Sequence, residues 1–171
     1  MRAAVRARRG FSLVELLIVI VIISVLVVIA VERLLVLRYE AERAMVQSVI
    51  GAMRSGLYVE FAGAAAGGQL KSLDSAAGSN PMLRLAERPD TYAGEFYGAD
   101  PKLFEPGTWY FDTRDRAVVY IVRFPEQFSS PLAGTPRLRL AVQPDYDPGR
   151  KSVHGLKLEP LEPYHWKPQG G

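Results

Sequence analysis

One apolar segment near the N-terminus constrains this chain more than any other feature. Residues 11–31 read FSLVELLIVIVIISVLVVIAV, and only Ser12, Glu15 and Ser24 interrupt the run with polar side chains. An α-helix of this length extends about 30 Å, which matches the hydrocarbon thickness of a bilayer. No second segment of the 171 residues is long and apolar enough to do the same. The sequence therefore predicts a single transmembrane helix.

The ten residues before this segment indicate its orientation. Residues 1–10, MRAAVRARRG, contain four arginines and no acidic residue. The positive-inside rule keeps such an N-terminus in the cytoplasm and exports the remainder of the chain. A conventional secretory signal is rejected, because the apolar run continues to Val31 and then meets Glu32 and Arg33 without a small-x-small cleavage site. A plain uncleaved signal anchor has no use for an acidic residue at position 15.

Glu15 needs a physical reason to lie inside an apolar helix. A carboxylate costs roughly 2.5–3.5 kcal/mol at the centre of a membrane helix, and less near an end. One interpretation is that Glu15 only snorkels toward the cytoplasmic headgroups. Its neighbours favour another, since Gly10 and Phe11 directly precede Ser-Leu-Val-Glu and an apolar run. This G-F-S-L-V-E junction resembles the N-terminus of type IV pilins and type II secretion pseudopilins.

The resemblance implies a processing site and an assembly residue. In that family prepilin peptidase, a membrane aspartyl protease, cuts after the glycine and methylates the new amine. The implied cut lies between Gly10 and Phe11, and Phe11 is the implied site of N-methylation. Glu15 lies one helical turn after Phe11, near the height of the new amine and the positive end of the helix dipole. When subunits stack with an axial stagger, Glu15 of one subunit can pair with the amine of the next.

Charge and cysteine content narrow the class of protein further. The formal charge of +3 suggests nucleic-acid binding at first, but four of the 21 basic residues lie in the leader, which leaves 17 against 18 acidic residues. We therefore expect no nucleic-acid partner. The chain has no cysteine, so the exported domain must rest on packing alone. Because many major pilins close a C-terminal loop with a disulfide, the resemblance then favours a pseudopilin over a pilus shaft subunit.

The remaining sequence predicts one pilin-like domain of the α+β class. Residues 32–62 continue the helix in amphipathic form, with apolar residues such as Val46 and Leu57 at helical spacing. Residues 63–107 form a variable connection rich in turn signals, with glycines 63, 67 and 68 ending the helix. Residues 108–159 form a four-stranded antiparallel sheet packed on the long helix, and residues 160–171 a tail outside it. The predicted strands are 108–112, 117–124, 137–143 and 153–159.

Few residues have the chemistry of a catalytic or metal site. No nucleophile, phosphate-loop or dinucleotide motif is present, so we expect no enzyme and no cofactor. Asp145 and Asp147 form one oxygen-rich loop, but two acidic residues are a fragment of the six to eight oxygens that calcium needs. An ordinary turn is therefore favoured, with calcium left open because the major pseudopilin binds it in a C-terminal loop. Tyr164 and Trp166 are either a contact patch or anchors of the tail.

The predicted function is structural and mechanical. We expect a type II secretion pseudopilin of the bacterial inner membrane, with a cytoplasmic N-terminus and a periplasmic domain. Its partners would be prepilin peptidase, other pseudopilins in a filament and the inner-membrane assembly platform. A minor pilin of a type IV or competence pilus is one alternative. Another is a monomeric membrane-tethered module that binds a periplasmic ligand, and a membrane-anchored enzyme ranks last.

Overall fold

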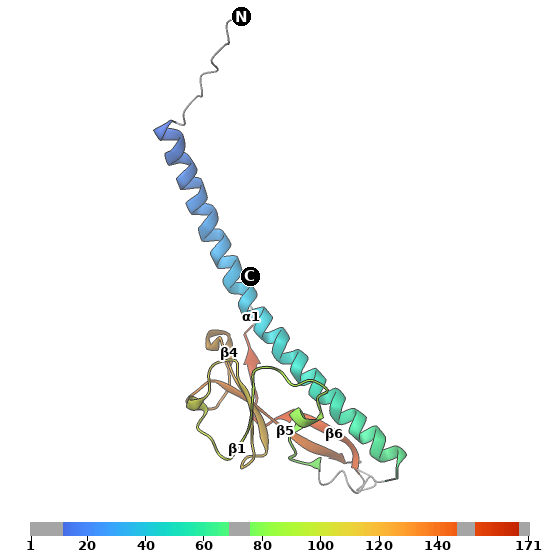
Figure 1. Ribbon diagram of the computed structural model, residues 1–171. Helices are drawn as coiled ribbons and strands as arrows, with labels where there is room; N and C mark the ends of the chain where they lie inside the picture. The colour runs from blue at the N-terminus through green and yellow to red at the C-terminus, as the bar shows by residue number, and fades with distance from the viewer. Residues whose placement is uncertain (1–11, 69–75, 147–152, 168–171) are drawn as a thin grey trace, which may run out of the picture. The chain divides into compact units, whose positions relative to one another are not determined.

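The computed structural model describes residues 12–68, 76–146 and 153–167 (Figure 1). The chain divides into two compact units, Met1–Glu40 and Ala41–Gly171. In the first unit the structure describes the N-terminal part of helix α1 (Leu13–Ala66). The second unit contains the rest of α1 and all of the strands. Each unit is described by itself below.

Helix α1 runs for 54 residues without a break. The predicted continuation of the membrane helix into an amphipathic helix is therefore confirmed, and α1 passes through Gly63 to end at Ala66. Its last turn closes with a 3.0 Å hydrogen bond from Gly67 N–H to the Gly63 carbonyl oxygen. Gly68 then adopts a φ of 68°, a left-handed conformation that glycine reaches without steric cost.

The main sheet has five strands in the order β1-β2-β3-β5-β6. Four of them are the predicted strands, and they pair antiparallel in that order. Their bounds are Trp109–Asp112 (β2), Ala117–Ile121 (β3), Arg137–Tyr146 (β5) and Val153–Pro160 (β6). The fifth, β1 (Tyr92–Phe96), pairs parallel with β2, so the prediction of a purely antiparallel four-stranded sheet is wrong.

Strand β1 lies in the segment that was predicted to be a connection. Its sequence YAGEF does not alternate clearly, and Gly94 has a φ of 109° where the register with β2 shifts. Side-chain contacts with Asn80 help to hold β1 in place. The Asn80 amide donates hydrogen bonds of 2.8 Å to the Tyr92 hydroxyl and 2.7 Å to the Glu95 carboxylate. The long connection is therefore ordered by packing at this point.

Between residues 81 and 127 the structure describes three short 3-10 helices. They are η2 (Pro81–Arg84), η3 (Pro101–Leu103) and η4 (Pro125–Gln127). Helix η2 lies within the segment that was predicted to be a connection, and its Arg84 forms an ion pair with Glu60 of α1. If Gly56 were alanine, its Cβ atom would lie only 3.0 Å from the Arg84 carbonyl oxygen. Helix η2 therefore packs closely on α1 at this glycine.

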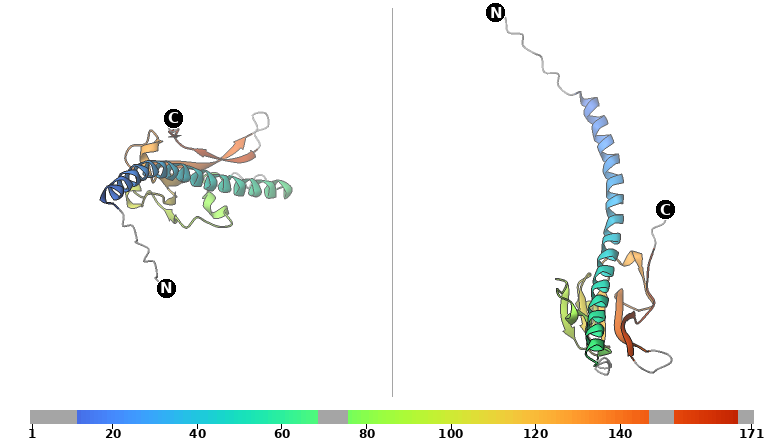
Figure 2. Two further views of the ribbon diagram at one scale, coloured as in Figure 1. Left: turned by 90° about the horizontal axis from the view of Figure 1, so that it is seen from above. Right: turned by 90° about the vertical axis from the view of Figure 1, so that its right-hand side faces the viewer.

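The hydrophobic core lies between α1 and one face of the sheet (Figure 2). The apolar stripe of α1 that was predicted from helical spacing contributes four fully buried side chains, Val46, Ile50, Met53 and Leu57. Alternate residues of the strands face them, as the period-two pattern requires. These are Trp109, Phe111, Val118, Tyr120, Leu138, Leu140, Val142 and Leu158. A smaller cluster of Tyr110, Val119 and Ile121 covers the opposite face with Phe104.

The C-terminal tail forms a second, two-stranded sheet. Strand β7 (His165–Trp166) pairs antiparallel with β4 (Phe128–Ser129), a pairing that the prediction of a tail outside the main sheet did not include. Aromatic packing explains the difference, since the Trp166 ring lies 5.0 Å from that of Phe128. Arg139 also pairs with Glu162. Tyr164 and Trp166 therefore anchor the tail.

Candidate functional site

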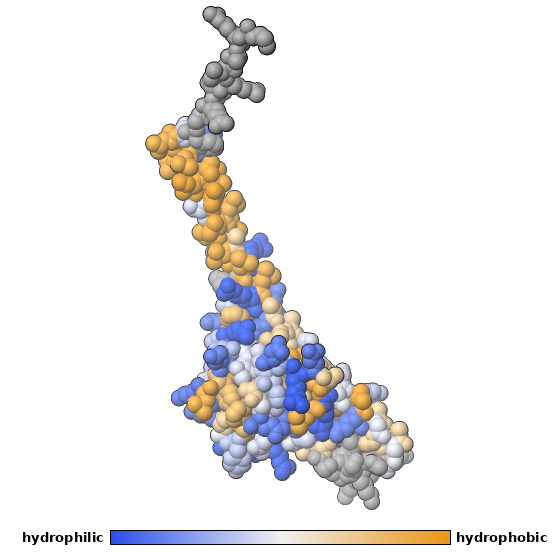
Figure 3. Space-filling model, in the orientation of Figure 1, coloured by the Kyte–Doolittle hydropathy of each residue, from blue (hydrophilic) through white to orange (hydrophobic). Residues whose placement is uncertain are grey.

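The apolar part of α1 is the clearest functional feature. Leu13–Val31 spans 19 residues with a mean hydropathy of 3.4, long and apolar enough to cross a membrane. None of its span is buried within the chain, and every large apolar side chain in it is exposed. Figure 3 shows this surface as mostly orange along the helix, with a few pale atoms between. Such a surface requires lipid or partner helices around it.

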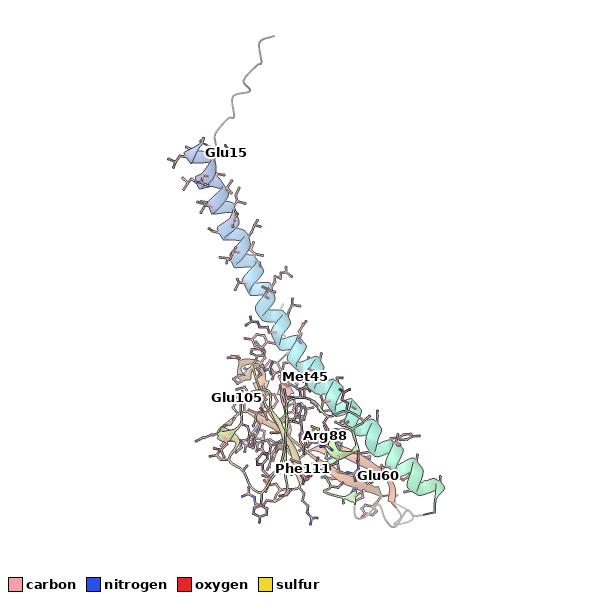
Figure 4. The ribbon with its side chains drawn as sticks, in the orientation of Figure 1. Glu15, Met45, Glu60, Arg88, Glu105 and Phe111 are labelled. Atoms are coloured by element: carbon pink, nitrogen blue, oxygen red, sulfur yellow. The ribbon has the colours of Figure 1, made fainter. Side chains whose placement is uncertain are left out.

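Glu15 lies in the first turn of α1 (Figure 4). Its backbone N–H donates a 3.4 Å hydrogen bond to Ser12 Oγ, and the Ser24 hydroxyl donates one of 2.7 Å to the Ile20 carbonyl oxygen. Both serines of the segment are thus engaged within the helix. The Glu15 carboxylate, in contrast, has no partner among the described residues. It lies at the positive end of the helix dipole, where it is available to a cation from outside the chain.

The other two residues of the predicted processing site, Gly10 and Phe11, lie outside the described residues. Helix α1 begins at Leu13, two positions after Phe11. The predicted cleavage and methylation at Gly10 and Phe11 therefore remain predictions.

The structure differs from the prediction of an oxygen-rich loop at Asp145 and Asp147. Asp145 belongs to strand β5, not to a loop, and its carboxylate forms a 2.9 Å ion pair with Lys157 of β6. This contact raises the pKa of the Lys157 ammonium. Asp147 lies outside the described residues. Within the part of the chain that the structure describes, no group of three or more histidine, aspartate or glutamate side chains is arranged to hold a metal ion.

Glu42 and Asp112 are acidic residues that the fold buries and that the sequence pattern did not single out. Glu42 of α1 is only 4% exposed, and its carboxylate accepts three hydrogen bonds. They come from the Tyr120 hydroxyl (2.8 Å), the Arg123 N–H (2.5 Å) and the Phe124 N–H (3.1 Å). Burial and the bond to Glu42 raise the pKa of Tyr120 well above its usual range. Glu42 stands four residues before Val46 in register with the apolar stripe, and that placement is the signal that reveals it.

The comparison with protein families agrees with the N-terminal geometry. Residues 5–31 match the prokaryotic N-terminal methylation motif, the prepilin-cleavage signature of type IV pilins and pseudopilins. This match confirms the resemblance drawn from the junction at residues 10–15. It covers residues 5–10 of the leader and the apolar segment, and none of the second unit. Comparison with curated proteins and with solved structures gave no match.

The match defines a coarse class for the chain. It supports a type IV pilin-like or pseudopilin protein, anchored in the inner membrane by its apolar helix. The motif implies processing by prepilin peptidase and assembly with other pilin subunits. Proteins with this signature are structural subunits rather than enzymes.

Proposed function

We propose that this chain is a pseudopilin of a type II secretion system. Before assembly it is inserted in the inner membrane, with its N-terminus in the cytoplasm and its second unit in the periplasm. Prepilin peptidase cleaves between Gly10 and Phe11 and methylates the Phe11 amine. The assembly platform then adds the subunit to a periplasmic filament that drives protein export. The observation that carries the proposal is the Glu15 carboxylate, which lies within the methylation motif and has no partner in the described part of the chain.

The chemistry of assembly follows from charge pairing. Cleavage creates an ammonium group on Phe11, one helical turn from Glu15. Inside a filament of packed apolar helices, both charges lie away from water, and each needs a partner. Glu15 has none among the described residues, so the amine of an adjacent subunit can supply it. The exposed apolar side chains of Leu13–Val31 then exchange lipid for neighbouring helices.

The second unit favours a type II secretion pseudopilin over a subunit of a pilus shaft. The chain has no cysteine to close a C-terminal loop. Its tail is held instead by the Arg139–Glu162 ion pair and by the packing of Trp166 on Phe128. The alternative of a tethered binding module loses support, because Tyr164 and Trp166 are half-buried in these contacts. A minor pilin of a type IV or competence pilus remains the alternative. It would be processed in the same way but would assemble into a pilus instead of a secretion filament.

The test uses the full chain in a strain that lacks its own gene and contains the secretion machinery and prepilin peptidase. Intact mass of the extracted protein should show loss of residues 1–10 and gain of one methyl group on Phe11. Gly10→Val should block this processing, whereas Gly10→Ala should process partly, because alanine is still small. Wild-type chain should restore secretion and leave piliation unchanged. Functional protein that retains its leader would overturn the proposal.

A further inference from the structure

The apolar surface of α1 continues past Val31. Leu34 and Leu37 follow on the helix, and their side chains are 57% and 56% exposed. The span Leu13–Val31 extends about 28 Å, which nearly fills the hydrocarbon layer of a bilayer. Leu34 and Leu37 lie about 4–9 Å further along the helix axis, within or just beyond a headgroup layer of roughly 5–7 Å. Two exposed leucines thus stand at the level of the lipid headgroups.

Two arginines flank these leucines. At about 100° per residue, Leu34 and Leu37 share one face of α1. On the same count, Arg33 and Arg38 lie about 40° to either side of that face. Both arginines are exposed. Because side chains of an α-helix tilt toward its N-terminus, both guanidinium groups can reach back toward the membrane edge while their stems cover apolar surface.

Neither arginine has an ion-pair partner in the described part of the chain. The positions three and four residues before and after Arg33 carry only apolar residues. Arg38 stands four residues before Glu42, but that carboxylate already accepts three hydrogen bonds from the second unit. Glu40 is two residues from Arg38, a spacing at which side chains on a helix do not face each other. Both charges are therefore available to an anion from outside the chain.

We propose that residues 33–38 of α1 bind the phosphate headgroups of lipids in the periplasmic leaflet of the inner membrane. Leu34 and Leu37 insert between the headgroups, and the two guanidinium groups donate hydrogen bonds to phosphate oxygens. Arginine suits this role because its planar group forms bidentate bonds with phosphate. Membrane orientation does not explain these cations, since the four arginines of the leader already hold the N-terminus in the cytoplasm.

The contact fixes the depth of α1 in the bilayer before the subunit leaves it. Its assignment to the periplasmic leaflet rests on the orientation given in the proposed function. The binding itself needs only the apolar span and the four residues Arg33, Leu34, Leu37 and Arg38. It is independent of cleavage at Gly10 and of assembly through Glu15. Failure of the lipid contact therefore leaves the proposed function standing.

Two other occupants fit this face less well. A free phosphate ion would meet the arginines but leave Leu34 and Leu37 in water. A neighbouring α1 helix at the same height would cover the leucines, but it would bring its own Arg33 and Arg38 beside those of the first helix, where like charges repel. Lipid satisfies both parts of the face, and it is continuous with the apolar surface of Leu13–Val31.

The first measurement locates the segment in a bilayer. The chain has no cysteine, so Leu37→Cys and Ala44→Cys each accept one bimane fluorophore. The full chain is reconstituted in vesicles of phosphatidylcholine and phosphatidylglycerol that contain lipid with a nitroxide on its headgroup. Quenching should be at least about threefold stronger at position 37 than at position 44, which lies on the same face about 10 Å further along the helix. Both leaflets have one composition, so the result does not depend on orientation.

The second measurement tests the arginines. Electron paramagnetic resonance of spin-labelled lipids gives the preference of the chain for phosphatidylglycerol over phosphatidylcholine. The double variant Arg33→Gln/Arg38→Gln should lower this preference at least about twofold, because two cation–phosphate contacts are lost. Arg43→Gln, an exposed position further along α1, is the matched control and should behave as wild type. The leader arginines are the same in all three chains, so their contribution cancels.

Inorganic phosphate distinguishes a lipid headgroup from a free ion. At the ionic strength of a chloride control it should leave the lipid preference unchanged, because the leucines tie the site to the bilayer. Displacement of lipid by phosphate would overturn the proposal. Equal quenching at positions 37 and 44, or an unchanged preference in the double glutamine variant, would do the same. So would a dimer that shields the label at position 37, since a second copy would then occupy this face.

Discussion

The carboxylate of Glu42 accepts a 2.8 Å hydrogen bond from the hydroxyl of Tyr120, a residue 78 positions further along the chain. Its two oxygens also accept the backbone N–H groups of Arg123 and Phe124, just beyond the end of β3. Both side chains are buried, so water cannot replace the bond between them. Glu42 thus ties α1 to the sheet through one fully satisfied carboxylate.

Removal of this carboxylate should destabilise the second unit strongly. Glu42→Ala leaves the buried Tyr120 hydroxyl without an acceptor, and we expect a loss of about 3–4 kcal/mol in the free energy of unfolding. Tyr120→Phe should cost about 1–2 kcal/mol, and the double variant should be less than additive. Denaturant unfolding of the full chain in micelles, followed by tryptophan fluorescence, measures these losses. The exposed Glu40→Ala is the control, and a loss below 1 kcal/mol for Glu42→Ala would contradict the assignment.

The raised pKa of Tyr120 makes stability fall at alkaline pH. Below about pH 10 the tyrosine is protonated in both the folded and the unfolded chain, and its contribution is complete. Above that pH the unfolded chain loses the proton while the buried hydroxyl keeps it. Stability should then fall by up to about 1.4 kcal/mol per pH unit from this group. Burial also raises the pKa values of Tyr92 and Tyr110.

Tyr120→Phe isolates the contribution of one hydroxyl. Its unfolding midpoint should decline less steeply than that of wild type between about pH 10 and pH 12. The remaining slope reports Tyr92, Tyr110 and Lys157 together, because the pKa of each is raised in the folded chain. Equal slopes in the variant and the wild type would show that Tyr120 titrates alike in both states.

The parts of the fold that the sequence predicts are those with a clear local period. Leu138, Leu140 and Val142 occupy every second position of the segment RLRLAVQ (137–143), so their common face follows from the pleat alone, and they lie in the core. Strand β1 has no such period, because Gly94 interrupts it. Its place beside β2 depends on contacts with Asn80, which no local pattern encodes.

The same distinction applies to the candidate sites. Glu15 is conspicuous because a charge within an apolar run needs a partner, and the sequence shows the anomaly directly. Glu42 also stands in an apolar stripe, but its partner Tyr120 is remote in sequence. Only the folded chain shows that the charge is satisfied. An acidic residue in register with a core stripe is therefore a useful sign of a buried acceptor.

Calcium should leave the stability of this chain unchanged. Asp145 already has Lys157 as its partner, and an ammonium at 2.9 Å opposes the approach of a cation. We expect the same thermal midpoint with excess calcium and with chelator, measured on the full chain in micelles. Asp145→Ala should cost less than about 1 kcal/mol, as exposed ion pairs do. A rise of several degrees in calcium would instead indicate a ligand site, through the linkage of binding to stability.

The sharpest prediction concerns Glu15→Gln. If Glu15 only snorkels, the substitution removes an unfavourable charge from the membrane, and function should be intact or improved. If it pairs with the Phe11 amine of a neighbour, glutamine leaves that amine buried without a counter-charge. Breaking such a pair costs about 3–5 kcal/mol. The two interpretations therefore predict opposite outcomes for one substitution.

We expect Glu15→Gln to insert and be cleaved normally, because the peptidase requires mainly the glycine and the apolar run, and then to fail in assembly. The variant is expressed without the wild-type gene, and its processing is confirmed by intact mass. Secretion and crosslinking between α1 helices of neighbouring copies are then measured. Glu40→Gln, an exposed acid further along α1, serves as the matched control and should behave as wild type. Normal secretion together with normal crosslinking in Glu15→Gln would refute the pairing, because no assembled subunit can then depend on that carboxylate.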